Sequence, residues 1–151
     1  MKILVTGANG QLGSELRYLS KNENAFDWTF TDLKELNISD INNLEKNISA
    51  IAPDILINCA AYTNVDKAES EPELVSQVNF KAVDEISKWS SANNCKLIHV
   101  STDYVFDGSS DNPLKEDAKT NPQNVYGITK LNGEMACLKN NPNSIIIRTS
   151  W

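Results

Sequence analysis

The chain has 151 residues and a net charge of −6, and a length near roughly 150 residues predicts a single domain. The acidic balance, without a lysine- or arginine-rich cluster, argues against a nucleic-acid binder. No apolar run approaches the roughly 18 residues of a membrane span, and Gly7 interrupts the N-terminal run too early for a signal peptide. Three widely spaced cysteines, Cys59, Cys95 and Cys137, are typical of a reducing compartment, so we expect a soluble cytoplasmic protein.

Short apolar segments alternate with longer amphipathic ones along the chain. The segments predicted as strands are residues 2–6, 28–31, 36–38, 54–58, 96–101 and 144–148. The segments predicted as helices are residues 11–21, a stretch capped by Ser39 and stopped by Pro53, residues 72–92 and residues 124–139. This alternation is typical of an α/β fold, a doubly wound parallel sheet with helices on both faces.

The polar segment 107–123 contains Pro113 and Pro122 and is long for a plain connection. Loops of this kind are often lids over a site, and a merely solvated loop is the alternative. The chain stops at Trp151 directly after a predicted strand, so we expect residues 1–151 to be part of a longer protein.

Gly7, Gly10 and Gly13 lie between the first predicted strand and the first predicted helix. Glycines at such a turn let the backbone approach a pyrophosphate, which the amide groups of the helix N-terminus bind. Asp32 ends the second strand, 19 residues after Gly13, where a carboxylate accepts hydrogen bonds from a ribose hydroxyl. A tight turn without a ligand would not explain both features, so we predict a dinucleotide-binding domain. Asp32 favours NADH because a carboxylate repels the 2′-phosphate of NADPH, and Lys34 would offset this repulsion, so both cofactors stay open.

Tyr126 and Lys130 lie one turn apart on the predicted helix 124–139. A nearby ammonium favours the phenolate, and moving a tyrosine pKa from about 10 toward 7 takes roughly 4 kcal/mol. Such a tyrosine can protonate an oxygen whose carbon receives a hydride. Ser101 and Thr102 end the preceding strand, where a hydroxyl would orient a carbonyl group. The alternative is a Tyr–Lys pair on the surface without a function. The position of Tyr126 and Lys130 in the chain, after a glycine-rich turn, disfavours this alternative.

These motifs together resemble the extended short-chain dehydrogenase/reductases, which share a Rossmann-type fold. Within that superfamily four segments resemble the dTDP-4-dehydrorhamnose reductase family, namely residues 58–69, 101–106, 124–134 and 148–151. The resemblance extends over the whole chain, and only Cys59 looks like a departure from the family pattern.

The resemblance implies a role for each matching residue. Tyr126 would donate the proton, Lys130 would lower its pKa and hold the nicotinamide ribose, and Thr102 would bind the C4 carbonyl. The cofactor-binding residues would be Gly7, Gly10, Gln11, Leu12, Gly13, Asp32, Asn37, Ile38, Ala61, Tyr62, Thr63, Tyr126 and Lys130. The deoxysugar would meet Thr102, Asp103, Tyr104 and Trp151, and Asn79 would support the site. Some family members bind Mg²⁺ at a dimer contact through a residue that matches Glu15. Because the remaining ligands are absent here and the helix dipole explains a glutamate in the first turn equally well, we predict no metal site.

The resulting hypothesis is the reduction of dTDP-4-dehydro-L-rhamnose to dTDP-L-rhamnose by NADH or NADPH, in the synthesis of surface polysaccharides. Family members run to nearly twice this length, so we expect the lobe that grips the nucleotide diphosphate to follow Trp151. The present chain would then bind cofactor with little turnover. The alternatives are a reductase or epimerase of another nucleotide-deoxysugar and a non-catalytic dinucleotide-binding subunit. The expected partner is the nucleotide sugar, and a homodimer is the candidate assembly.

Overall fold

The computed structural model describes residues 1–150, and its five strands form one parallel sheet in the order β2-β1-β3-β4-β5. The strands are β1 Lys2–Thr6, β2 Asp27–Phe30, β3 Ile55–Asn58, β4 Lys96–Thr102 and β5 Ile145–Thr149. The helices are α1 Gln11–Ser20, α2 Ile41–Ile51, α3 Val65–Ala68, α4 Pro72–Ser76, α5 Ala82–Ala92 and α6 Val125–Asn140. A π-helical turn, Gln77–Lys81, joins α4 to α5, and a 3₁₀ turn, Asp103–Val105, follows β4. Across residues 1–150, none of the helices combines the length and the apolar character that a membrane crossing requires.

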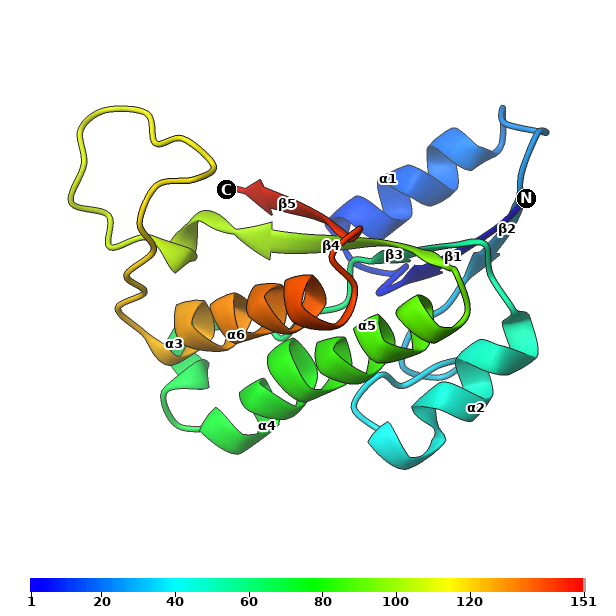
Figure 1. Cartoon of the computed structure of the whole chain (residues 1–151), viewed down its shortest axis with the longest axis horizontal. Coiled ribbons are helices and arrows are strands. Elements are labelled where there is room, and N and C mark those ends of the chain that lie inside the picture. Colours follow the sequence, from blue (N-terminus) through cyan, green and yellow to red (C-terminus); the bar gives the residue numbers. More distant parts are fainter. Residues whose placement is uncertain (151) are drawn as a thin grey trace.

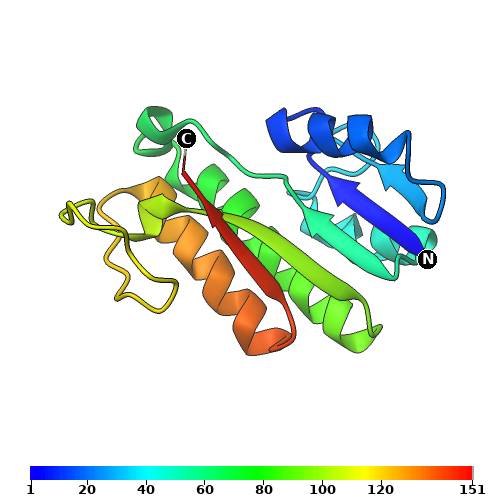
Figure 2. The same cartoon turned by 90° about the horizontal axis from the view of Figure 1, so that it is seen from above.

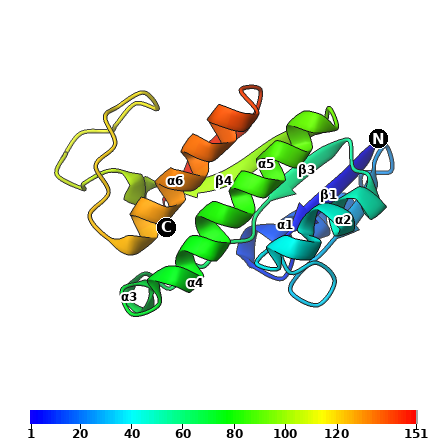
Figure 3. The same cartoon turned by 60° about the horizontal axis from the view of Figure 1, so that its bottom comes forward.

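Helices cover both faces of the sheet, which confirms the doubly wound class. Helix α1 lies on one face, and α2, α5 and α6 lie on the other (Figures 1 and 3). The chain moves in one direction along the sheet from β1 to β2 and in the opposite direction afterwards. Because parallel crossovers are right-handed, this reversal places α1 opposite the later helices.

The main core lies between the sheet and helices α2 and α5. Leu4, Leu56 and Leu97 are paired in register on three neighbouring strands, and each is at most 1% exposed. Ile48 of α2 and Ile86 of α5 belong to the same buried cluster. Burying a side chain of this size contributes about 1.5–3 kcal/mol, so this row fixes the register of the strands that carry the site.

A second apolar row crosses the other face of the sheet. Val5, Ile57, Ile98 and Ile145 are register partners on β1, β3, β4 and β5. Figure 2 looks onto this face and shows no helix in front of β4 and β5. Ile145 is 52% exposed and its neighbour Ile147 is 48% exposed, so among the described residues this end of the sheet lacks a covering layer.

Two predicted features between β2 and α2 are wrong. No strand forms at residues 36–38, because the amide of Leu36 bonds back to the carbonyl of Asp32 in a turn. Leu36 and Ile38 are nevertheless buried in the main core, so their apolar character reflects burial rather than strand pairing. The N-cap of α2 is Asp40 instead of Ser39, whereas the stop at Pro53 is confirmed, since α2 ends at Ile51.

The predicted helix 72–92 is continuous, but it contains the π-helical turn at Gln77–Lys81. Periodicity over the whole segment does not show this one-residue shift. Helix α3 is too short to give a periodic pattern and was not predicted. The predicted loop 107–123 contains no helix or strand.

Candidate functional site

The glycine-rich turn between β1 and α1 depends on the absence of side chains at two positions. Gly7 has a φ of +66°, and a Cβ there would lie 2.6 Å from the backbone nitrogen of Ala60, just after β3. A Cβ on Gly13 would lie 2.4 Å from the carbonyl oxygen of Gly7. Glycine therefore allows the turn to pack against the end of β3 and allows α1 to pack against the turn.

Gly10 and the start of α1 form an open cradle that fits a pyrophosphate. Gly10 is the N-cap of α1, no side chain caps the helix, and its first turn contains no acidic residue. A Cβ on Gly10 would approach only the carbonyl oxygen of Gly7, at 3.3 Å, so the outer side of the turn is free. Gln11 and Leu12 are exposed there. Free amide groups at a helix N-terminus bind anions, so these residues fit the phosphate groups of a dinucleotide.

Asp32 lies beside this cradle at the end of β2. Its Oδ2 accepts the backbone N–H of Asn9 at 2.9 Å, and its Oδ1 accepts that of Leu33 at 2.8 Å. The structure thus brings together the glycine turn and the carboxylate that the sequence placed apart. Asn37 and Ile38 are two further residues expected to bind the cofactor. Asn37 is exposed, whereas the side chain of Ile38 points into the core.

The segment 61–63, which follows β3, is held by the side chain of Asn79. Asn79 Oδ1 accepts the N–H of Tyr62 at 2.8 Å, and its Nδ2 donates to the carbonyl of Tyr62 at 3.0 Å. The same Nδ2 lies 3.4 Å from the hydroxyl of Thr129 on α6. Asn79 is fully buried within the π-helical turn, and such turns are frequent at functional sites. Asn79 therefore ties residues 61–63, which are expected to bind the cofactor, to the helix that carries Tyr126 and Lys130.

Thr102, Asp103, Tyr104 and Tyr126 gather where β4 ends and α6 begins. The hydroxyl of Thr102 donates to Asp103 at 3.1 Å and accepts the N–H of Tyr104 at 3.2 Å. The rings of Tyr104 and Tyr126 meet edge to face, with centroids 5.5 Å apart. Asn124 caps α6 by accepting the N–H of Gly127, which fixes the first turn of the helix and with it Tyr126.

The protonation of Tyr126 differs from the expectation. Burial raises the pKa of its phenol, hydrogen bonding by Thr102 opposes this rise, and the nearby Asp103 adds to it. Lys130 is only 1% exposed, and its Nζ donates to the carbonyl of Val100 at 2.6 Å. Burial lowers the pKa of this lysine to about 8. The predicted lowering of the Tyr126 pKa by Lys130 is therefore wrong for this structure, because burial dominates and the ammonium is bonded elsewhere.

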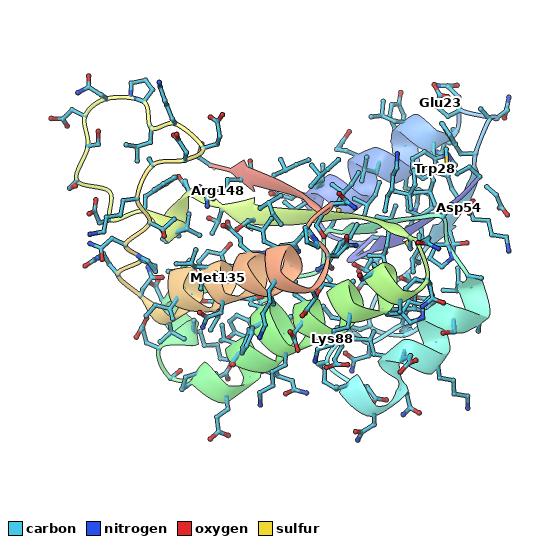
Figure 4. All side chains as sticks on the ribbon, viewed as in Figure 1. Glu23, Trp28, Asp54, Lys88, Met135 and Arg148 are labelled. Carbon is cyan, nitrogen blue, oxygen red and sulfur yellow. The ribbon has the colours of Figure 1, made fainter. Side chains whose placement is uncertain are left out.

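The loop 107–123 borders a cavity of about 330 Å³ next to this group, whose lining includes Asp103, Tyr104 and Leu114. Arg148 on β5 (Figure 4) fixes the loop from the other side. Its guanidinium forms three hydrogen bonds to the buried carboxylate of Glu134, donates to the carbonyl of Glu116 at 2.9 Å and stacks on Phe106. Nothing in the sequence spacing linked Arg148 to Glu134 or to the loop.

The predicted site residues thus collect along the carboxyl ends of the parallel strands, where open α/β sheets bind ligands. The glycine turn and Asp32 lie at the β1–β2 side, and Thr102, Asp103, Tyr104 and Tyr126 lie at the β4 side. Trp151, the remaining predicted substrate contact, lies outside the described residues.

A parallel Rossmann-type sheet with a glycine-rich phosphate turn and a Thr–Tyr–Lys set defines a nucleotide-binding protein similar to the short-chain dehydrogenase/reductases. The model of the family described as RmlD substrate binding domain matches residues 1–151. The chain belongs to this family, and the resemblance noted in the sequence is confirmed.

Named relatives agree with this assignment. The chain is 45% identical to the dTDP-4-dehydrorhamnose reductase of Escherichia coli K12, over 100% of this chain and 51% of that protein. It is 43% identical to the Salmonella typhimurium reductase, over the same shares of the two chains. The solved structure of a Clostridium acetobutylicum dTDP-4-dehydrorhamnose reductase superimposes with a TM-score of 0.96 at 39% identity, over 100% of this chain and 54% of that one.

The reductase of Bacillus anthracis, solved in complex with NADP, superimposes with a TM-score of 0.93 at 37% identity, over 99% of this chain and 53% of that one. The present chain therefore spans about half the length of the relatives that it matches.

Proposed function

We propose that this chain is the cofactor-binding and proton-donating part of an NAD(P)H-dependent reductase. The substrate in this proposal is dTDP-4-dehydro-L-rhamnose, whose C4 keto group becomes the hydroxyl of dTDP-L-rhamnose. Support comes from relatives named dTDP-4-dehydrorhamnose reductase and from one such relative solved with NADP. The observation that carries the proposal is the meeting of the glycine cradle, Asp32 and the Thr102–Tyr126 pair along one edge of the sheet.

The reaction adds a hydride to a carbonyl carbon and a proton to its oxygen. A bound reduced nicotinamide dinucleotide supplies the hydride, and the protein must supply the proton and hold the ketone. Tyr126 suits proton donation because its raised pKa keeps the phenol protonated until the oxygen becomes basic. The hydroxyl of Thr102 lies beside the phenol and would orient the carbonyl oxygen, and solvent would return the proton to Tyr126 afterwards.

Lys130 and Asn79 would prepare the site around Tyr126. In this structure the Lys130 ammonium is bonded to Val100, so in our proposal it leaves that carbonyl to hold the nicotinamide ribose. Asn79 would keep Ala61, Tyr62 and Thr63 in place as the wall of the nicotinamide pocket.

Titration of the chain with NADH and NADPH, followed by fluorescence, tests the binding half of this proposal. We expect saturable binding of both and at least a roughly tenfold loss of affinity in Gly10→Ala, whose methyl group enters the phosphate cradle. Ser20→Ala, at the other end of α1, is the matched control and should bind like the parent chain. Absence of binding in a chain with a folded circular dichroism spectrum would contradict the proposal.

The catalytic half concerns turnover of the ketosugar. Because the chain spans half of its relatives, we propose cofactor binding with little turnover for residues 1–151 alone. An absorbance assay of NADPH oxidation with dTDP-4-dehydro-L-rhamnose should stay near background. Substantial turnover that persists in Tyr126→Phe would contradict both the low activity and the proton-donor role. A homodimer is part of the same proposal, and sedimentation would test it.

A further inference from the structure

The end of β2 carries charges of both signs next to the glycine turn. Asp32 accepts the N–H of Asn9, and Glu35 accepts the N–H of Asp32 at 3.0 Å, so two carboxylates lie on this side. Lys34 occupies the exposed turn between them. Arg17 of α1 contacts both Asn9 of the glycine turn and Phe30 at the end of β2.

Two contacts hold the side chain of Arg17 next to the glycine turn and the end of β2. Its guanidinium carbon lies 5.3 Å from the ring centroid of Phe30, the last residue of β2. Its Nη1 donates to Asn9 Oδ1 at 3.4 Å. Asn9 thus links the two opposite charges, since its backbone N–H bonds to Asp32 and its side chain bonds to Arg17.

Arg17 also has unused capacity to bind an anion. Within residues 1–150 no carboxylate lies within 4.0 Å of its guanidinium. Only one of its five N–H donors has a hydrogen-bond partner in this part of the chain. A guanidinium presents its donors in a planar fork that matches a phosphate group.

We propose that Arg17 determines whether the site takes NADPH as well as NADH, by receiving the 2′-phosphate of NADPH. In Rossmann-type sites the acidic residue after the second strand binds the 2′-hydroxyl of NAD, and a nearby arginine accommodates the 2′-phosphate of NADP. Here Asp32 disfavours the phosphate and Arg17 compensates for it. The inference rests on the proposed dinucleotide site and adds the residue that sets its cofactor preference.

Lys34 is the competing cation, and the structure favours Arg17. Lys34 is exposed and has no hydrogen bond or ion pair to any residue from 1 to 150 that would hold its ammonium near Asp32. A long free side chain loses rotamer entropy when it binds. Arg17 has already lost part of this freedom, because Phe30 and Asn9 restrain it.

The test is the ratio of the dissociation constants for NADPH and NADH, measured by fluorescence titration of the 151-residue chain. Arg17→Gln should weaken NADPH binding by roughly tenfold, since a hydrogen-bonded charge pair is lost, and leave NADH binding unchanged. Lys34→Gln should change neither constant. The matched control is Lys21→Gln at the end of the same helix, whose ammonium lies over Tyr18 and away from the turn.

An unchanged ratio in Arg17→Gln would overturn the inference, as would a loss of NADPH affinity confined to Lys34→Gln. Equal weakening of both dinucleotides in Arg17→Gln would also overturn it, because the residue would then act on the shared phosphates. Absence of binding of both dinucleotides to the parent chain would instead refute the proposed function.

Discussion

Replacement of Arg148 by Met probes the ion pair that joins β5, α6 and the 107–123 loop. The Glu134 carboxylate is 3% exposed, and Arg148 Nη2 lies 2.7 Å from it. The substitution leaves this carboxylate buried without a cation and removes the hydrogen bond to the carbonyl of Glu116. It also removes the stacking of the guanidinium on Phe106.

The expected loss follows from the burial of the two partners. Removing one partner of a fully buried pair costs about 3–5 kcal/mol. The side chain of Arg148 is 23% exposed, so water reaches the site and we expect a loss of about 2–3 kcal/mol in the free energy of unfolding. Urea unfolding followed by circular dichroism measures this loss. Faster tryptic cleavage after Lys115 and Lys119 would report the release of the loop.

The double variant Glu134→Leu/Arg148→Met separates loss of the pair from loss of the arginine alone. With both charges removed, no buried carboxylate lacks a partner, so the double variant should be more stable than Arg148→Met. A double variant that is less stable than Arg148→Met, or a single variant as stable as the parent chain, would refute the reasoning. Arg148→Lys keeps the charge without the planar fork of donors, so its free energy of unfolding should lie between those of the parent chain and of Arg148→Met.

Three further substitutions test other contacts. Gly13→Ala should lower stability by about 1–3 kcal/mol in thermal melts, because its methyl group meets the backbone of Gly7 and Ala8, and an unchanged melting temperature would contradict this. Asn79→Ala leaves the N–H and carbonyl of Tyr62 without partners, so it should cost about 2–4 kcal/mol and weaken NADH binding, and unaltered affinity would argue against its role in the wall. Burial lowers the folded-state pKa of Lys130 from 10.5 to about 8, so between these values the unfolded chain binds more protons and stability rises with pH. Relative to Lys130→Met, the parent chain should therefore gain up to about 3 kcal/mol over this window in urea titrations, and a constant difference would refute the burial argument.

The fold was largely predictable because short buried strands and amphipathic helices have distinct periods. The row Leu4, Leu56 and Leu97 illustrates this, since each residue lies in an apolar segment bounded by turn residues. Leu36 and Ile38 show where apolar periodicity fails to predict a strand. Their spacing matches a strand, yet only the three-dimensional packing determines that they enter the core from an irregular segment.

The candidate site was likewise predictable from the sequence only in part. Motifs located the glycine turn, Asp32 and Tyr126, because their chemistry depends on a fixed position after a strand or on a helix. The partner of Lys130 was not predictable, since a buried ammonium takes whichever carbonyl the packing offers, here that of Val100. The contacts of Arg148 with Glu134 and with the loop 107–123 join segments that are far apart in the chain, so no local sequence pattern predicts them.

The π-helical turn at Gln77–Lys81 has a consequence for the length of the chain. Each helical residue turns the axis by about 100°, so one extra residue sets α4 and α5 in different rotational phases. Deleting a single residue from this turn would restore an unbroken α-helix and rotate α4 relative to α5 by that angle. Asn79 would then leave the backbone of Tyr62, although no residue of the site itself had been changed in type. The number of residues in this helix is thus as much a requirement of the site as their identity.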